Sequence, residues 1–110
     1  MGEPMNTGNI FADIPVQLPD ELFEDVLKTC AVRVERIVSR GHSSPEGFWY
    51  DQDRSEWVIV LKGRARLRFE GQADAVEMGA GDYINIPAHT RHRVEWTELE
   101  GDTVWLAVHY

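Results

Sequence analysis

Apolar and polar residues alternate with a period of two along most of the chain beyond residue 31, in short segments separated by glycines. In the segment 64–70, three apolar positions alternate with three arginines, which predicts a strand with one buried and one solvent-exposed face. The segment 56–61 is apolar at nearly every position, so we expect a strand that is buried on both faces. The Lys62-Gly63 pair between these two segments predicts a tight hairpin turn.

The remaining segments beyond residue 31 show the same short, alternating pattern. Further strands are expected at 31–39, within 71–82, and at 83–87, 91–96 and 102–110. In the segment 91–96, His92, Val94 and Trp96 share one face, which we expect to point into the interior. About six to eight short strands joined by glycine-rich turns predict an all-β antiparallel sandwich or barrel.

The N-terminal part of the chain has a different pattern. The first 17 residues show no periodicity and are interpreted as an arm. In residues 18–29, Pro19 and the acids after it are typical of a helix N-terminus, and apolar residues recur at 22, 23, 26 and 27. This spacing predicts one short helix. We therefore expect a single domain, with an arm and short helix over 1–30 and a β-barrel over 31–110.

The charge of the chain narrows the classes of partner. With 19 acidic and 11 basic residues, the 110-residue chain has a net charge of −8, which argues against nucleic-acid binding. Five arginines are a local exception, because they alternate along two predicted strands, at 64, 66, 68, 91 and 93. They form either a basic patch or a solvated outer sheet face paired with glutamates.

The sequence shows no targeting signal for a compartment outside the cytoplasm. There is no signal peptide at the N-terminus, and no apolar run reaches the roughly 18 residues of a membrane span, so a cytoplasmic location is expected. The single cysteine, Cys30, excludes an internal disulfide and is interpreted as a small buried residue beside a strand.

Two stretches of the chain resemble the signature motifs of the cupin superfamily. In "EWVIVLKG", Glu56 is followed by six residues and then Gly63, and in "GDYINIPAHTRHRVEW", Gly81 is followed by five residues, Pro87 and then His92. The motifs read G-x5-H-x-H-x(3,4)-E-x6-G and G-x5-P-x-G-x2-H-x3-N. The resemblance covers about residues 31–110. It implies an antiparallel jelly-roll β-barrel, a homodimer, and a divalent metal inside the barrel.

The resemblance carries over only part of the metal-ligand set. Glu56 matches the glutamate of the first motif, and His92 matches the histidine of the second. The two histidines of the first motif fall at Tyr50 and Gln52 when the shorter spacing is used. Two of the four expected ligands are therefore exchanged.

Other positions also depart from the motifs. With the longer spacing, the two missing histidines fall at Trp49 and Asp51. His89 stands where the second motif has glycine, and Trp96 stands where it has asparagine.

The residues that remain form a mixed nitrogen and oxygen set. Residues 50 and 52 share one face of an extended segment, so we expect Glu56, His92, Gln52 and Tyr50 to meet, with His89 as a possible second imidazole. Such a set would loosely suit Fe, Mn, Ni or Zn. The alternative is a metal-free pocket in which Glu56 and His92 bind a ligand or each other.

The other aromatic residues and histidines add less to the predicted site. Phe48 and Trp96 are expected to line the pocket, although packing in the core is the alternative for both. His109 has no supporting spacing and is interpreted as a surface or structural residue.

Two functions follow from this interpretation, and the catalytic residues stay unknown under both. The first is a small metal-binding cupin that acts on a small polar molecule, as an oxygenase- or isomerase-type enzyme. The second is a metal-free cupin that binds or senses a small ligand without catalysis. Neither involves a nucleic acid or a membrane.

Overall fold

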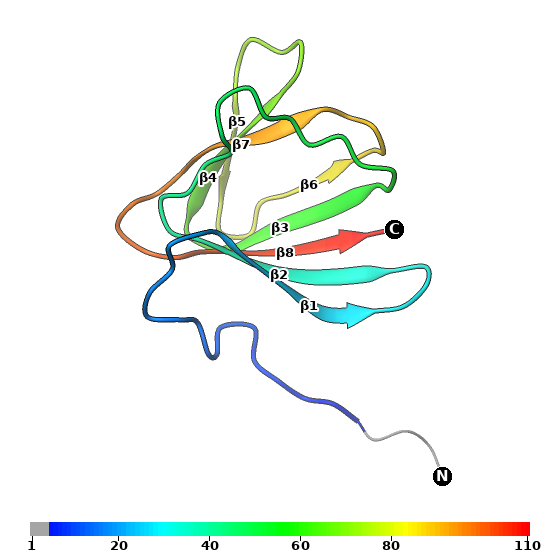
Figure 1. The fold of residues 1–110 in the computed structure, drawn as a ribbon, viewed down its shortest axis with the longest axis vertical. Helices are drawn as coiled ribbons and strands as arrows, with labels where there is room; N and C mark the ends of the chain where they lie inside the picture. The colour runs from blue at the N-terminus through cyan, green and yellow to red at the C-terminus, as the bar shows by residue number, and fades with distance from the viewer. Residues whose placement is uncertain (1–4) are drawn as a thin grey trace.

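The computed structural model describes residues 5–110, which form two antiparallel β-sheets (Figure 1). The strands are β1 (Leu22–Lys28), β2 (Arg33–Ser39), β3 (Glu56–Lys62), β4 (Arg64–Phe69), β5 (Val76–Gly79), β6 (Tyr83–Ile86), β7 (His92–Thr97) and β8 (Thr103–His109). The larger sheet has the order β1-β2-β8-β3-β6, and the smaller has the order β5-β4-β7. The predicted all-β antiparallel jelly-roll architecture is confirmed.

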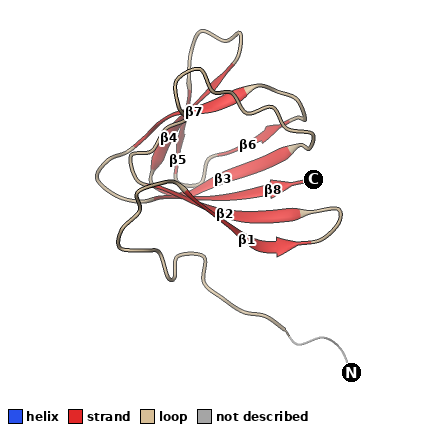
Figure 2. Cartoon of the chain, in the orientation of Figure 1, coloured by secondary structure: helices blue, strands red, loops and turns tan. Residues whose placement is uncertain are grey.

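The predicted N-terminal helix is wrong. Residues Leu22–Lys28 form an edge strand, and the described residues contain strands and loops but no helix (Figure 2). Pairing with β2 satisfies the backbone of this segment, whereas a helix of seven residues is not stable by itself. A β-bulge at Val26 interrupts the alternation of side chains and produces the apolar spacing that imitates a helix.

The core lies between the inner faces of the two sheets. Its buried apolar side chains come from five strands and include Val58, Val60, Ala65, Leu67, Phe69, Met78, Ile86, Trp105 and Ala107. The alternation predicted for β4 is confirmed. The expectation that β3 is buried on both faces is wrong, because only its inward positions are buried. The outward Trp57 is half-buried and packs against Tyr83 on β6, with their ring centroids 5.5 Å apart.

The hairpin turn between β3 and β4 has the expected glycine. Gly63 has a φ of +90°, and a Cβ atom there would lie 2.5 Å from the hydroxyl of Thr103 and 2.7 Å from the carbonyl oxygen of Asp102. Only glycine satisfies both the positive φ and this close approach.

The long segment between β2 and β3 runs along β7. The Ser44 N–H donates to the carbonyl of Val94 at 2.8 Å, and Tyr50 and His92 exchange two backbone hydrogen bonds of 2.7 and 3.1 Å. The His89 N–H then donates to the carbonyl of Gln52 at 2.8 Å. These contacts hold residues 50–52 across the open side of the two sheets.

The arginine-rich outer face is paired rather than free. Arg66 contacts Glu77 at 2.8 Å, Arg68 contacts Glu95 at 2.7 Å, and a further pair joins Arg91 and Glu70. The interpretation of these arginines as an outer sheet face paired with glutamates is therefore confirmed for three of the five.

Two observations concern other expectations about the chain. Cys30 is exposed, so the expectation that it is buried is wrong. It lies in the turn that joins β1 to β2, and not beside the strand's inner face. Within residues 5–110, no helix is long and apolar enough to cross a membrane.

Candidate functional site

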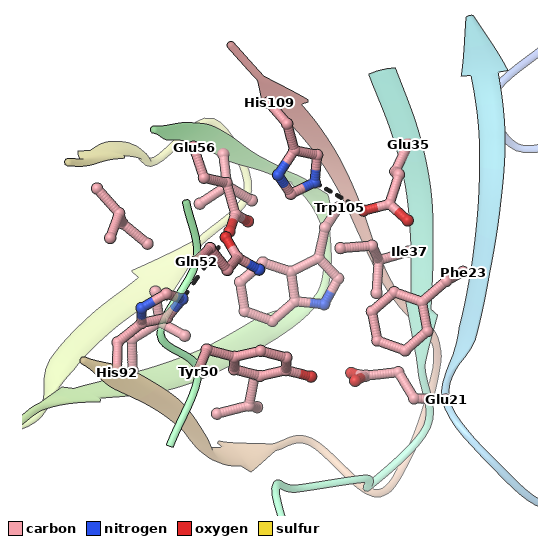
Figure 3. Close-up of a pocket in the computed structure, with 14 residues that line it drawn as sticks. Glu21, Phe23, Glu35, Ile37, Tyr50, Gln52, Glu56, His92, Trp105 and His109 are labelled. Carbon is pink, nitrogen blue, oxygen red and sulfur yellow. Dashed lines mark hydrogen bonds and ion pairs between the residues drawn. The ribbon is translucent and has the colours of Figure 1, made fainter. Parts of the chain in front are cut away.

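A cavity lies between the two sheets, with Tyr50 and Gln52 among the residues that line it (Figure 3). Its volume is about 50 Å³, which is room for a few waters or for one end of a small ligand. It is lined by Glu21, Phe23, Glu35, Ile37, Tyr50, Gln52, Glu56, Val58, Leu67, Ile86, His92, Val94, Trp105 and His109. Most of these side chains are apolar or aromatic, so the few ionisable groups among them are placed in a poorly hydrated environment.

Three ionisable side chains enter the cavity from neighbouring strands of the larger sheet. Glu35 lies on β2, His109 on β8 and Glu56 on β3, and these strands are adjacent in the order β2-β8-β3. Glu56 and His109 are direct cross-strand partners. Figure 3 shows His109 between the two glutamates. The sheet order thus brings together residues that lie up to 74 positions apart.

His109 forms a hydrogen-bonded pair with Glu35. Its Nε2–H donates to the Glu35 carboxylate at 2.7 Å, and Arg33 contacts the same carboxylate at 3.0 Å. The hydrogen bond to Glu35 raises the pKa of the His109 imidazole above its ordinary value, although burial acts in the opposite direction. The imidazolium form of His109 is therefore more populated near neutral pH than that of an ordinary histidine.

His92 faces the same cavity from β7 in the smaller sheet. Its Nδ1–H donates to the carbonyl of Thr90 at 2.8 Å, which leaves Nε2 directed into the cavity. Nε2 lies 3.8 Å from the Glu56 carboxylate, a distance too long for a hydrogen bond. The imidazole ring stacks on the ring of Tyr50, with centroids 5.4 Å apart.

Glu56 is a buried carboxyl group that lies near both histidines. It is 8% exposed, and burial raises the pKa of its carboxyl above the usual range, against the opposite effects of His109 and His92. Burial and the nearby glutamates also raise the pKa of the Tyr50 phenol to about 12. Tyr50 therefore stays neutral near pH 7 and has a hydroxyl proton to donate.

A further carboxyl group, that of Glu21, closes the other end of the cavity. It accepts a hydrogen bond from the hydroxyl of Ser39, which in turn accepts one from the indole N–H of Trp105 at 3.1 Å. Burial raises the pKa of the Glu21 carboxyl, against the effect of the Ser39 hydrogen bond. Figure 3 shows this carboxyl facing the hydroxyl of Tyr50.

Four of the five residues predicted as metal ligands meet in the cavity. Tyr50, Gln52, Glu56 and His92 all line it. His89 does not, because it lies in the turn before β7 with a φ of +61° and donates from Nδ1 to Asp51 at 2.9 Å. Its positive φ fits a position where the motif has glycine.

Neither residue predicted to line the pocket does so. Phe48 is 43% exposed and packs edge-on against the outer side of Tyr50, with centroids 4.8 Å apart. Trp96 lies on the outer face, where the guanidinium of Arg66 sits 4.6 Å from its ring centre. The cause is a bulge in β7 at Glu95, since Arg66 pairs with Trp96 and the next residue of β4 pairs with Val94. One extra residue moves every later side chain to the opposite face.

Three ionisable residues of the cavity were missed from the sequence, namely Glu21, Glu35 and His109. Of the two interpretations of His109, as a surface or a structural residue, the first is wrong, because its side chain is 12% exposed and bonded to Glu35. Its period-two alignment with the buried Trp105 and Ala107 on β8 was the available signal. No such signal existed for Glu21, which lies within the segment 18–29 that was predicted as a helix.

The side chains that line the cavity offer few ligands for a metal ion. Within residues 5–110, no three carboxylate, imidazole or thiol side chains are arranged to hold one metal. Glu56 and His92 offer two ligands, but the Nε2 of His109 is bonded to Glu35, and Tyr50 and Gln52 are neutral. Catalytic zinc sites, for example, use three protein ligands. The residues present do not fit a metal centre of that kind.

Several solved structures similar to this chain are named as cupins. A protein from Ralstonia eutropha JMP134, named as a candidate mannose-6-phosphate isomerase, is 49% identical, with 94% of this chain and 96% of that chain covered and a TM-score of 0.91. A cupin superfamily protein from Desulfitobacterium hafniense DCB-2 is 18% identical, with coverages of 96% and 92% and a TM-score of 0.74. An RmlC-like cupin from Methanocaldococcus jannaschii is 17% identical, with coverages of 88% and 85% and a TM-score of 0.68.

The family comparison agrees with these structures. No curated protein sequence matches the chain. The family model described as "Cupin domain" matches residues 36–109, which contain every cavity-lining residue except Glu21, Phe23 and Glu35. On the sequence match, the two-sheet fold and the 49% identical structure, the chain belongs to the cupin family.

Proposed function

We propose that this cupin is an isomerase-type enzyme that moves protons within a small polyhydroxylated carbonyl compound by acid–base catalysis. The observation that carries the proposal is a buried glutamate, Glu56, that faces two imidazoles in one cavity. Support also comes from the 49% identical structure named as a candidate mannose-6-phosphate isomerase. A sugar isomerisation of that type requires a base at a carbon and an acid at the adjacent oxygen.

Glu56 is the proposed base. Because burial raises its pKa, its carboxylate is a stronger base than that of an exposed glutamate and is closer to the ideal of a catalytic pKa near the operating pH. It takes the proton from the carbon next to the carbonyl group. The electron pair of that C–H bond becomes the C=C bond of an enediol.

The pair formed by His109 and Glu35 is the proposed acid. As the enediol forms, the carbonyl oxygen becomes a hydroxyl by accepting a proton from the His109 imidazolium, which Glu35 stabilises. Glu56 then returns its proton to the former carbonyl carbon, while the hydroxyl on the carbon that lost its proton gives a proton to His109 and becomes the new carbonyl. The proton count balances, and neither an oxidant nor a reductant is needed.

His92 and Tyr50 are proposed to position the substrate. The Nε2 atom of His92 is directed into the cavity. Because it lies too far from the Glu56 carboxylate to form a hydrogen bond, it is available to a substrate hydroxyl. The neutral Tyr50 phenol adds a hydrogen-bond donor. Stacking of the two rings holds both groups in place.

A second candidate function is binding of a small ligand without catalysis. The observation that favours it is the small volume of the cavity, which admits only the end of a sugar-sized molecule. In that function Glu56 and His92 would form hydrogen bonds with the ligand and transfer no proton.

The test is a substrate panel followed by proton NMR. Pairs of aldoses and ketoses, with and without a phosphate group, are incubated with wild-type protein and with Glu56→Gln. Glu77→Gln, a change at an exposed glutamate of β5, is the matched control. Each protein is assayed after treatment with a chelator and again with added Fe(II), Mn, Ni or Zn.

We expect interconversion of at least one pair by the wild type and by Glu77→Gln after chelator treatment. We expect a loss of at least about 100-fold in kcat for Glu56→Gln, which is the usual contribution of a general base. Conversion that depends on one added ion would contradict the proposal and favour a metal-dependent enzyme. Binding of a sugar with no conversion under any condition would favour the second candidate.

A further inference from the structure

A wider hollow adjoins the cavity and opens to solvent. It has a volume of about 490 Å³ and shares Tyr50, Gln52 and His109 with the cavity, so it is the outer continuation of the same site. Its rim is formed by the turn between β1 and β2 and by the loop before β3. The two segments are joined by a hydrogen bond of 2.9 Å from the guanidinium of Arg54 to the carbonyl of Cys30. A substrate whose reactive end enters the cavity must place its other end in this hollow.

The rim carries three cationic side chains, of which two lack an anionic partner. Arg33 contacts Asp25 at 2.6 Å and Glu35 at 3.0 Å, so its charge is balanced. Lys28 and Arg54 form no ion pair with any residue of the described chain. Arg54 donates one N–H to a backbone carbonyl, and its guanidinium has four other N–H groups.

The two carboxylates of the hollow do not neutralise these cations. Glu35 is engaged by His109 and Arg33. The side chain of Asp53 is 96% exposed, and its carboxylate lies 3.8 Å from the Nε2 atom of His89. Lys28 and Arg54 therefore leave a positive site at the mouth of the cavity, in a chain whose net charge is −8.

We propose that Lys28 and Arg54 bind the anionic group of the substrate, a phosphate or a carboxylate, while its reactive end lies beside Glu56. This proposal rests on the proposed function, since it names the class of substrate for the same site. A guanidinium and an ammonium are the two side chains that bind such oxyanions through charge-assisted hydrogen bonds. The anion also explains how a small cavity serves a larger molecule, because most of the binding takes place outside it.

The test measures anion binding without turnover. Inorganic phosphate and, separately, acetate are titrated into ¹⁵N-labelled full-length protein at constant ionic strength, and the backbone amide shifts are followed. The variants are Lys28→Gln and Arg54→Gln. The matched control is Lys62→Gln, which removes the same charge from the other lysine, at the end of β3.

We expect saturable shifts at residues 28–29 and 53–54, and an affinity about tenfold lower in Lys28→Gln and Arg54→Gln. Lys62→Gln keeps the wild-type affinity. Phosphate binding with none by acetate assigns a phosphate ester as substrate, and the reverse assigns a carboxylate. No saturable shift with either anion, or an equal loss in Lys62→Gln, overturns the proposal.

The titration of the wild-type protein, taken together with the substrate panel, separates this proposal from the proposed function. Anion binding by a wild-type protein that isomerises no sugar would contradict the proposed function alone. Isomerisation of an uncharged sugar by a protein that binds neither anion would contradict the anion site alone.

Discussion

The burial of Glu56 raises the pKa of its carboxyl and, at neutral pH, lowers the free energy of unfolding. Its side chain is 10% exposed, and the pKa of its carboxyl is raised because burial disfavours the charged form. The folded state therefore holds this proton more tightly than the unfolded state does. It follows that the free energy of unfolding falls as the pH rises from the unfolded pKa through the folded one.

Glu56→Gln is thus expected to stabilise the protein while it removes activity. At pH 8 the variant should gain about 1 kcal/mol in the free energy of unfolding, because a buried carboxylate is replaced by a neutral group of the same shape. At pH 4, where the carboxyl is largely protonated in both states, the gain should vanish. Urea unfolding followed by tryptophan fluorescence measures both values.

The control for this prediction is Glu77→Gln, whose carboxylate is 68% exposed. Its stability should stay within about 0.5 kcal/mol of the wild type at both pH values. A Glu56→Gln protein that is less stable than the wild type at pH 8 would show that His92 and His109 outweigh the cost of burial.

At the scale of elements, the turn between β3 and β4 sets the spacing between the two sheets. Gly63 combines a φ of +90° with contacts of 2.5–2.7 Å for a built Cβ, partly against the backbone of β8. Gly71 has a similar φ of +84°, but nothing lies within 4 Å of its built Cβ. A substitution at Gly71 therefore tests backbone strain alone, whereas a substitution at Gly63 tests backbone strain and steric clash together.

Gly63→Ala should lower the free energy of unfolding by about 3 kcal/mol, and Gly71→Ala by about 1 kcal/mol. The larger loss reflects the clash with Thr103, which cannot move without disturbing its strand. Thermal unfolding by circular dichroism gives the comparison. Equal losses in the two variants would mean that the turn next to β8 is free to shift.

The strands that keep a regular alternation were predictable from the sequence, and those with bulges were not. β4 has its buried and exposed faces as expected. In β1 the bulge at Val26 imitates a helical spacing, and in β7 the bulge at Glu95 moves Trp96 to the outer face. A bulge inserts one residue without any fixed sequence signal, so the period of two cannot be followed across it.

The candidate site was predictable to a similar degree. Glu56 and His92 were identified from their motif positions, and both line the cavity. The pair formed by Glu35 and His109 was missed because it depends on β2 and β8 being neighbours, although the residues lie 74 positions apart. Strand order is a property of the whole sheet, and the alternation within one strand carries no information about it.

At the scale of the whole molecule, the larger sheet supplies the proposed base and acid, and the smaller sheet supplies the positioning histidine. The chain joins them with residues 50–52 across one side of the cavity, while the hollow beside Lys28 and Arg54 forms its mouth. The homodimer implied by the resemblance stays a prediction. Substrate entry is expected through the mouth, so the outer end of the substrate is the end that is recognised by charge.

The measurement that tests the central claim most directly is proton exchange in heavy water. Wild-type protein, treated with a chelator, is incubated in D₂O with mannose 6-phosphate and with mannose, and the C2 proton signal is followed by NMR. This signal reports proton transfer at the carbon even when net conversion is slow. We predict loss of the C2 proton in the wild type and none above background in Glu56→Gln. A C2 proton that persists in the wild type with both sugars, or equal exchange in Glu56→Gln, would contradict an acid–base isomerase site centred on Glu56.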